Sequence, residues 1–286
     1  MITMHFMVLL SSLVIGAAGA TGYASWRALK RPVEDVLLCG REPKQPGERR
    51  IVCAGDSLTH ATVSFDYVGA LRLRMGPGVR VLNAGVNGDL AFNLAERLET
   101  IVSAEPDDVV VMIGTNDLSG AQNAKVAQRQ VSIKKLPEQA SQAFFEREFT
   151  RLLTGLRART QARLWVVTPP LLGEDLTHPV HARLLVYAAA IERIASAHGA
   201  RVLPFHSVME DALKASGHRP RPGFHLGAIE ASWLALLPLQ RFVLGMSFDQ
   251  VSKRHGLWGS PDLIHLNETS GDLLANLIED ALSSVS

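Results

Sequence analysis

Five short apolar runs alternate with longer segments that have helical spacing, a pattern that few folds can satisfy. The runs cover 51–55, 79–82, 109–113, 164–167 and 201–203. The connections between them are too long for hairpins, so consecutive runs are expected to pair as parallel strands through crossover helices. The third run has no polar residue, which is typical of a strand buried on both faces of a sheet. The sequence therefore predicts an α/β domain with helices on both faces of a parallel sheet.

Composition agrees with one large globular domain. The chain has 286 residues, of which 47% are hydrophobic and 20% charged, and this is enough for a substantial core. A formal net charge of +1 gives no electrostatic reason to expect a nucleic-acid partner. The two cysteines, Cys39 and Cys53, are too few for a disulfide framework. Cys53 is expected as a small buried residue of the first strand, and a bridge between the two cysteines stays open.

The first 25 residues form a segment apart from this domain. Residues 4–24 contain no Asp, Glu, Lys or Arg, and the run is about as long as a membrane-spanning helix. It is either a retained anchor or an export signal with a cleavage site at Ala18-Gly19-Ala20. Basic residues are absent before the run but follow it, at Arg27, Lys30 and Arg31. This favours an anchor with the domain on the cytoplasmic side, and export after cleavage is the alternative.

The remaining chain divides into a linker and the domain. Residues 26–48, with proline and glycine among charges, predict a linker, and 49–286 the domain. Helices are expected over 67–75, 90–103, 138–160, 180–197 and 269–282, with an irregular or loosely helical stretch over 121–137. Thr269 and Asp272 are spaced as a capping box for the last helix. The apolar insertion over 221–258 is expected to form either a lid or acyl-chain wall over the site, or an extra core layer.

Three predicted strands end in polar loops that carry groups a catalytic site needs. The first run ends in Gly55-Asp56-Ser57-Leu58, which places the Ser57 hydroxyl at the carboxyl edge of the sheet, where open α/β folds bind ligands. Taken alone, this stretch is equally consistent with Asp56 and Ser57 capping a helix. The second and third loops supply Gly88, in a Gly- and Asn-rich turn, and Asn116. The first loop is therefore a candidate nucleophile loop, and the other two are candidate donor loops.

An acid and an imidazole three residues apart, Asp262 and His265, precede the last helix. Asp262 can accept a hydrogen bond from Nδ1 of His265 while Nε2 points outward. A serine hydroxyl is a weak nucleophile without a base, and an oriented histidine is the usual base. Acyl transfer also needs donors for the oxyanion, which the Ser57 N–H, Gly88 and the Asn116 amide can supply. The chain has no G-x-S-x-G, so the nucleophile elbow of α/β-hydrolases is not expected.

Four blocks occur in a diagnostic order: Gly55-Asp56-Ser57-Leu58, residues 83–89 (NAGVNGD), Gly114-Thr115-Asn116-Asp117 and Asp262-Leu263-Ile264-His265. Together they resemble the signature blocks of the SGNH (GDSL-type) hydrolase superfamily, over roughly residues 49–282. The resemblance implies a three-layer α/β/α domain with a flavodoxin-like five-stranded sheet, and metal-free hydrolysis of carboxylic esters or thioesters.

Carried over by position, the resemblance implies Ser57 as nucleophile, His265 as base and Asp262 as the group that orients it. The oxyanion hole is then formed by Ser57, Gly88 and Asn116, with Gly85 as a less favoured alternative to Gly88. Two positions depart from the common pattern: Leu266 stands where a proline often follows the histidine, and His60 stands where an acid is common. Neither departure removes a catalytic group.

We therefore expect a serine hydrolase that cleaves small-molecule or lipid esters through an acyl-enzyme. The apolar insertion and the first segment favour lipid-like acyl esters and a membrane partner. A glycan O-acetyl esterase or an acyltransferase is the closest alternative, and a non-catalytic binding module is a remote one, since no triad residue is missing. His178 and His181 have no acidic third ligand at a recognised spacing, so neither a metal nor a cofactor is expected.

Overall fold

The computed structural model describes residues 19–32, 34–39, 42–220 and 228–284. Most of the predicted membrane or signal segment, 1–25, lies outside these ranges, and its last residues belong to a helix over 19–29. Within the described ranges, no helix is both long and apolar enough to cross a membrane.

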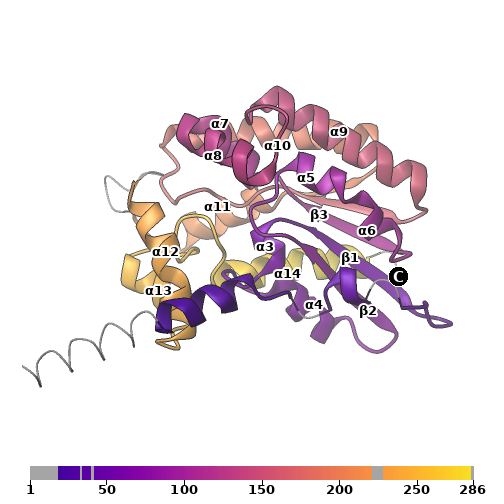
Figure 1. Cartoon of the computed structure of the whole chain (residues 1–286), viewed down its shortest axis with the longest axis horizontal. Coiled ribbons are helices and arrows are strands. Elements are labelled where there is room, and N and C mark those ends of the chain that lie inside the picture. The colour runs from indigo at the N-terminus through magenta and orange to yellow at the C-terminus, as the bar shows by residue number, and fades with distance from the viewer. Residues whose placement is uncertain (1–18, 33, 40–41, 221–227, 285–286) are drawn as a thin grey trace, which may run out of the picture.

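A parallel sheet of five strands lies at the centre of the fold (Figure 1). The strands are β1 (Arg49–Gly55), β2 (Val79–Gly85), β3 (Asp108–Met112), β4 (Arg163–Val167) and β5 (Arg201–Leu203). Their order is β2-β1-β3-β4-β5, with every neighbouring pair parallel. This is the flavodoxin-like order, and it confirms the predicted sheet. The apolar runs became strands because sheet burial on both faces suits β-branched residues.

Helices cover both faces of the sheet, so the domain has three layers (Figure 1). One face carries α4 (Tyr67–Arg74), α11 (Phe205–Ala215) and α14 (Glu268–Ser283). The other carries α5 (Ala91–Glu96), α6 (Leu98–Val102), α9 (Gln142–Arg159) and α10 (Pro179–Ala197). The remaining helices are α2 (Val36–Cys39), α3 (Ser57–His60), α7 (Thr115–Gln122), α8 (Ala124–Lys134), α12 (Ala228–Phe242) and α13 (Phe248–His255).

Several helices differ in detail from the prediction. The helix expected over 90–103 is divided at Arg97 into α5 and α6, and most of the stretch over 121–137 forms the regular helix α8. The capping box at Thr269 and Asp272 is wrong. Asn267 caps α14 instead, since its side chain accepts a hydrogen bond from the Ser270 N–H. Thr269 bonds to Asp249 of α13, a partner that lies outside local sequence spacing.

The described part of the apolar insertion packs as a second, smaller core. Leu237 of α12 and Phe248 and Val251 of α13 are buried together with Val63, and the helix over 19–29 packs Ala28 against them. Residues 221–227, part of the predicted lid, lie outside the described residues. Helices α12 and α13 therefore form a small layer beside the main domain.

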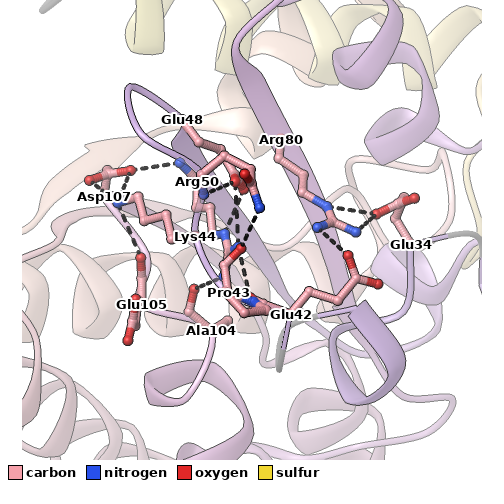
Figure 2. Close-up of polar contacts among 11 residues, drawn as sticks. Glu34, Glu42, Pro43, Lys44, Glu48, Arg50, Arg80, Ala104, Glu105 and Asp107 are labelled. Carbon is pink, nitrogen blue, oxygen red and sulfur yellow. Dashed lines mark hydrogen bonds and ion pairs between the residues drawn. The ribbon is translucent and has the colours of Figure 1, made fainter.

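Ion pairs hold the segment over 26–48 against the amino ends of the strands (Figure 2). Arg50 is only 1% exposed. Its guanidinium donates to Glu48 Oε1 at 2.6 Å, to Ala104 O at 3.1 Å and to Glu42 O at 2.9 Å. Arg80 on β2 pairs with both Glu34 and Glu42. The predicted linker is thus bound to the sheet at several points.

This network predicts unequal effects of two arginine substitutions. Arg50→Ala would remove a buried guanidinium from the half-buried Glu48 carboxylate and from two carbonyl groups, so we expect the free energy of unfolding to fall by about 3 kcal/mol. The matched control, Arg80→Ala, removes a partly exposed pair and should cost less than about 1 kcal/mol. Urea denaturation of the full chain in mild detergent, followed by tryptophan fluorescence, measures both. Equal losses would contradict the special role of Arg50.

Candidate active site

The carboxyl ends of three neighbouring strands bring the predicted loops together. Gly55, the last residue of β1, pairs with Gly85 on one side and with Met112 on the other. Ser57 follows as the first residue of α3, and Asp56 caps this helix by accepting a hydrogen bond from the Leu58 N–H at 3.0 Å. Both interpretations of this stretch therefore hold: Asp56 is the cap, and Ser57 is free to face the site.

Ser57, His265 and Asp262 form one continuous chain of contacts. His265 Nε2 lies 2.9 Å from Ser57 Oγ, and His265 Nδ1 lies 2.7 Å from Asp262 Oδ2. The second carboxylate oxygen, Asp262 Oδ1, accepts from the backbone N–H groups of His265 at 2.8 Å and Ile264 at 3.1 Å. Asp262 is fully buried and His265 is 4% exposed. The geometry orients the imidazole so that its outer nitrogen meets the serine hydroxyl.

The electrostatics of this pair favour a charged imidazole next to a charged carboxylate. Burial alone would lower the pKa of His265, but the charge of Asp262 and its hydrogen bond outweigh burial and raise it above 6.5. Burial alone would likewise raise the pKa of Asp262, and the contacts with His265 outweigh it and lower that pKa. The arrangement can therefore stabilise a proton taken up by His265.

Glu174 in the loop after β4 holds the segment that leads to Asp262. This buried carboxylate accepts from the N–H of Trp258 at 2.9 Å and of Gly259 at 2.8 Å, and it lies 3.2 Å from His218 Nε2. The neighbouring Gly173 N–H donates to Leu263 O at 2.9 Å. Our sequence reasoning did not find Glu174. Its only signal was an acid in a polar loop at the carboxyl edge of the fourth strand.

A second supporting cluster holds the turn that contains Gly88. The buried carboxylate of Asp89 accepts from Arg97 Nε at 2.8 Å and from Lys134 Nζ at 2.9 Å. Arg97 also donates to Gly55 O at 2.9 Å, which ties the turn to the end of β1. Lys134 donates to Asn87 O at 2.5 Å. Gly88 has φ +73°, a conformation that a residue with Cβ rarely adopts.

Gly85, the less favoured oxyanion donor, has a structural role in the packing of α3 against β2. A Cβ at this position would lie 2.1 Å from the backbone nitrogen of His60, so only glycine lets α3 approach β2. Its N–H already donates to Asn83 Oδ1 at 2.9 Å. Gly88 therefore remains the better candidate donor.

The Asn116 side chain lies next to the nucleophile loop. Its amide nitrogen donates to Asp89 O at 3.0 Å and, at a longer 3.3 Å, to Asp56 Oδ2. Gln130 of α8 fixes the backbone of Asn116 by donating to its carbonyl at 2.8 Å. Burial raises the pKa of Asp56 to about 7. The loops after β1, β2 and β3 are thereby joined through one amide.

The remaining candidate ligands have structural roles. His178 caps α10 by accepting from the Val180 N–H, and His181 lies 3.4 Å from Glu210. In the part of the chain that the structure describes, no group of three or more His, Cys, Asp or Glu side chains is placed to hold a metal ion. Cys53 is buried in β1 as a free thiol, and burial raises its pKa to about 12.

The profile of the GDSL-like lipase/acylhydrolase family matches residues 53–229, more than half of the chain. The chain belongs to this family. It is a carboxylic ester hydrolase of the GDSL esterase/lipase type, as the SGNH resemblance implied. The match includes Ser57, Gly88 and Asn116 and ends before Asp262, so the link from Ser57 to Asp262 and His265 comes from the structure.

Solved structures share the fold of this GDSL-family chain. An α/β hydrolase from the metagenome of Lake Arreo, Spain, is 19% identical, with a TM-score of 0.55 over 83% of this chain and 96% of the other. An acetylxylan esterase from Geobacillus stearothermophilus is 16% identical, with a TM-score of 0.55 over 82% and 94%. No curated protein sequence matches the chain.

The contact between His265 and Asp262 predicts how the histidine titrates. In the full chain, NMR should show His265 with a midpoint above 6.5, because the buried carboxylate favours the protonated ring. Asp262→Asn removes that charge and leaves burial, so the midpoint should fall below the wild-type value. A wild-type midpoint below 6.5 would contradict the assigned electrostatics.

Proposed function

We propose that this GDSL-family enzyme cleaves carboxylic esters through a Ser57–His265–Asp262 triad and an acyl-enzyme intermediate. The observation that supports this most directly is the 2.9 Å contact between Ser57 Oγ and His265 Nε2, backed by the buried Asp262 carboxylate. A serine within hydrogen-bond reach of an imidazole, which is oriented by a third group, is the arrangement that activates a hydroxyl nucleophile.

In the first half of the reaction, Ser57 Oγ attacks the ester carbonyl carbon while His265 Nε2 takes the hydroxyl proton. The resulting imidazolium is stabilised by Asp262, which stays ionised. His265 then gives this proton to the leaving alcohol as the carbon–oxygen bond breaks. In the second half, His265 takes a proton from water while the water oxygen attacks the acyl carbon. His265 then returns this proton to Ser57 Oγ as the bond between the acyl carbon and Oγ breaks and the acid leaves.

The negative charge on the carbonyl oxygen needs donors, which we assign to the N–H of Ser57, the N–H of Gly88 and the Asn116 amide. One such donor is typically worth about 2.7 to 4 kcal/mol of barrier. The long contact of Asn116 with Asp56 is the one an oxyanion would replace. Because burial raises the pKa of Asp56 to about 7, this acid is partly neutral near pH 7 and opposes a nearby oxyanion less than a full charge would.

For the substrate, we propose lipid-like acyl esters, supported by the uncharged run over residues 4–24. Removal of O-acetyl groups from a glycan is the second candidate. Support for it comes from the likeness to an acetylxylan esterase and from the described insertion, whose buried residues pack in a separate core. An acyltransferase would use the same groups, with an alcohol in place of water.

Replacing the nucleophile tests the triad. Ser57→Ala should reduce kcat for p-nitrophenyl acetate by at least about ten-thousandfold, because no other group then forms the acyl-enzyme. The matched control is Ser119→Ala on α7, whose hydroxyl bonds only locally, to Thr115 O, and it should keep wild-type kcat. Activity that survives in the Ser57 variant would exclude Ser57 as nucleophile.

Acyl-chain length separates the two substrate classes. Comparing kcat/KM for p-nitrophenyl acetate with the decanoate, in full-length protein below the micelle concentration of the ester, should show at least about a tenfold preference for decanoate. A long chain gains roughly 0.8 kcal/mol per buried CH₂ group. A strong preference for acetate would favour the glycan candidate instead and leave the triad assignment intact.

A further inference from the structure

A cavity of about 440 Å³ lies outside the proposed triad, between the helix over 19–29, the α12–α13 insertion and the loop over 60–66. Ser57 does not line it, but His60, at the other end of α3, does. Its size falls within the range of roughly 300 to 1,000 Å³ that is typical of ligand sites. None of the three triad residues lines this cavity, so the proposed reaction gives it no role.

The cavity is basic. Four cationic side chains line it: Arg27, Lys30, Arg31 and Arg241. Two acids also line it: Glu268 accepts from the N–H groups of Phe248 and Asp249, and Asp66 accepts from the Gly69 N–H. The four cations outnumber these two carboxylates, so the lining keeps a net positive charge that can attract an anion.

The cations are held in place by aromatic rings. The Arg27 guanidinium lies 4.9 Å from the centroid of Phe242, and that of Arg241 lies 5.1 Å from the centroid of Phe248. Among the described residues, Arg27, Lys30 and Arg241 have no acidic partner, whereas Arg31 lies 3.5 Å from Asp35. Two ordered guanidinium groups can bind the oxygens of a phosphate.

The helix that carries these cations also carries an exposed apolar face. Ala24 and Ala28 face the protein, while Trp26 is 58% and Leu29 74% exposed, and Tyr23 is exposed too. Tryptophan and tyrosine beside arginine and lysine are enriched where a protein meets the headgroups of a bilayer. In Figure 1 this indigo helix lies against α12 and α13.

We propose that this cavity binds the phosphate of an anionic phospholipid headgroup while the face of the helix over 19–29 rests on the bilayer surface. The uncharged run over 4–24 ends within this helix and would bring it to a membrane. Anionic lipids lie mainly in the cytoplasmic leaflet, so the domain faces the cytoplasm in this arrangement.

A bound headgroup would also touch the parts that carry the proposed triad. Ala28 O, in the helix over 19–29, accepts from Thr62 Oγ1 at 2.6 Å and from Asn87 Nδ2 at 3.1 Å. The loop over 60–66 in turn bonds to Leu266, next to His265, through Ser64 Oγ at 3.0 Å. The cavity is thus built on segments that adjoin Ser57, Gly88 and His265.

The test is a binding measurement that does not depend on esterase activity. The full chain, held in neutral dodecyl maltoside micelles, is titrated with dihexanoyl phosphatidylglycerol and with dihexanoyl phosphatidylcholine, and binding is followed by thermophoresis. We expect the anionic lipid to bind at least about tenfold more tightly, and the double variant Arg27→Gln/Arg241→Gln to lose at least about tenfold in affinity for it. Arg129→Gln, an exposed arginine on α8, is the matched control and should bind as wild type.

Three results would overturn the proposal: equal affinity for the two lipids, equal loss in the Arg129 control, or displacement of the lipid by an equal concentration of inorganic phosphate, which would mean a site for free phosphate. If circular dichroism shows that the double variant is unfolded, Lys30→Gln at an exposed position decides instead. This substitution should lower the affinity for the anionic lipid severalfold. An unchanged affinity would equally refute the headgroup site.

Discussion

Parallel pairing of β1 with both β2 and β3 determines where the other parts of the site lie. Because Gly55 pairs with Gly85 and with Met112, three strands end at the same level, and their loops leave the sheet side by side. Gly85 then allows α3 to approach β2, since any Cβ there would collide with His60. A change of register at β1 would move Ser57 away from Asn116 and from the turn at Gly88 together.

Buried or half-buried carboxylates fix the loops whose backbone groups have no partner in the sheet. Backbone N–H groups in irregular segments need acceptors when they are buried. Glu174 supplies them for the segment before Asp262, and Glu268 for the start of α13. Asp89 instead forms ion pairs with Arg97 and Lys134, and these hold the turn at Gly88. Removing Glu174 would therefore loosen a loop far from it in sequence while leaving the sheet unchanged.

The sequence predicted the parts of this structure that depend on local pattern. All five strands were found, because burial on both faces requires apolar runs, and the order of polar blocks identified the family. The capping of α14 by Asn267 was missed because Thr269 offered a spacing just as good, while its actual partner, Asp249, belongs to another helix. Glu174 was missed for a similar reason, since the two backbone N–H groups that it binds lie more than 80 residues away. Contacts of this kind leave no periodic signal.

The ion pairs of Arg50 and Arg80 limit how far the helix over 19–29 can move relative to the domain. A flexible linker over 26–48 would have a root-mean-square end-to-end distance of roughly 25 Å. Glu34, Glu42 and Glu48 instead hold this stretch against the amino end of the sheet (Figure 2). Ala28, near its start, bonds to Thr62 beside the opposite end. The segment is thus held at both ends of the sheet and does not behave as a flexible linker. The helix over 19–29 and the sheet are therefore expected to move as one body, because contacts at both ends of the sheet hold them together.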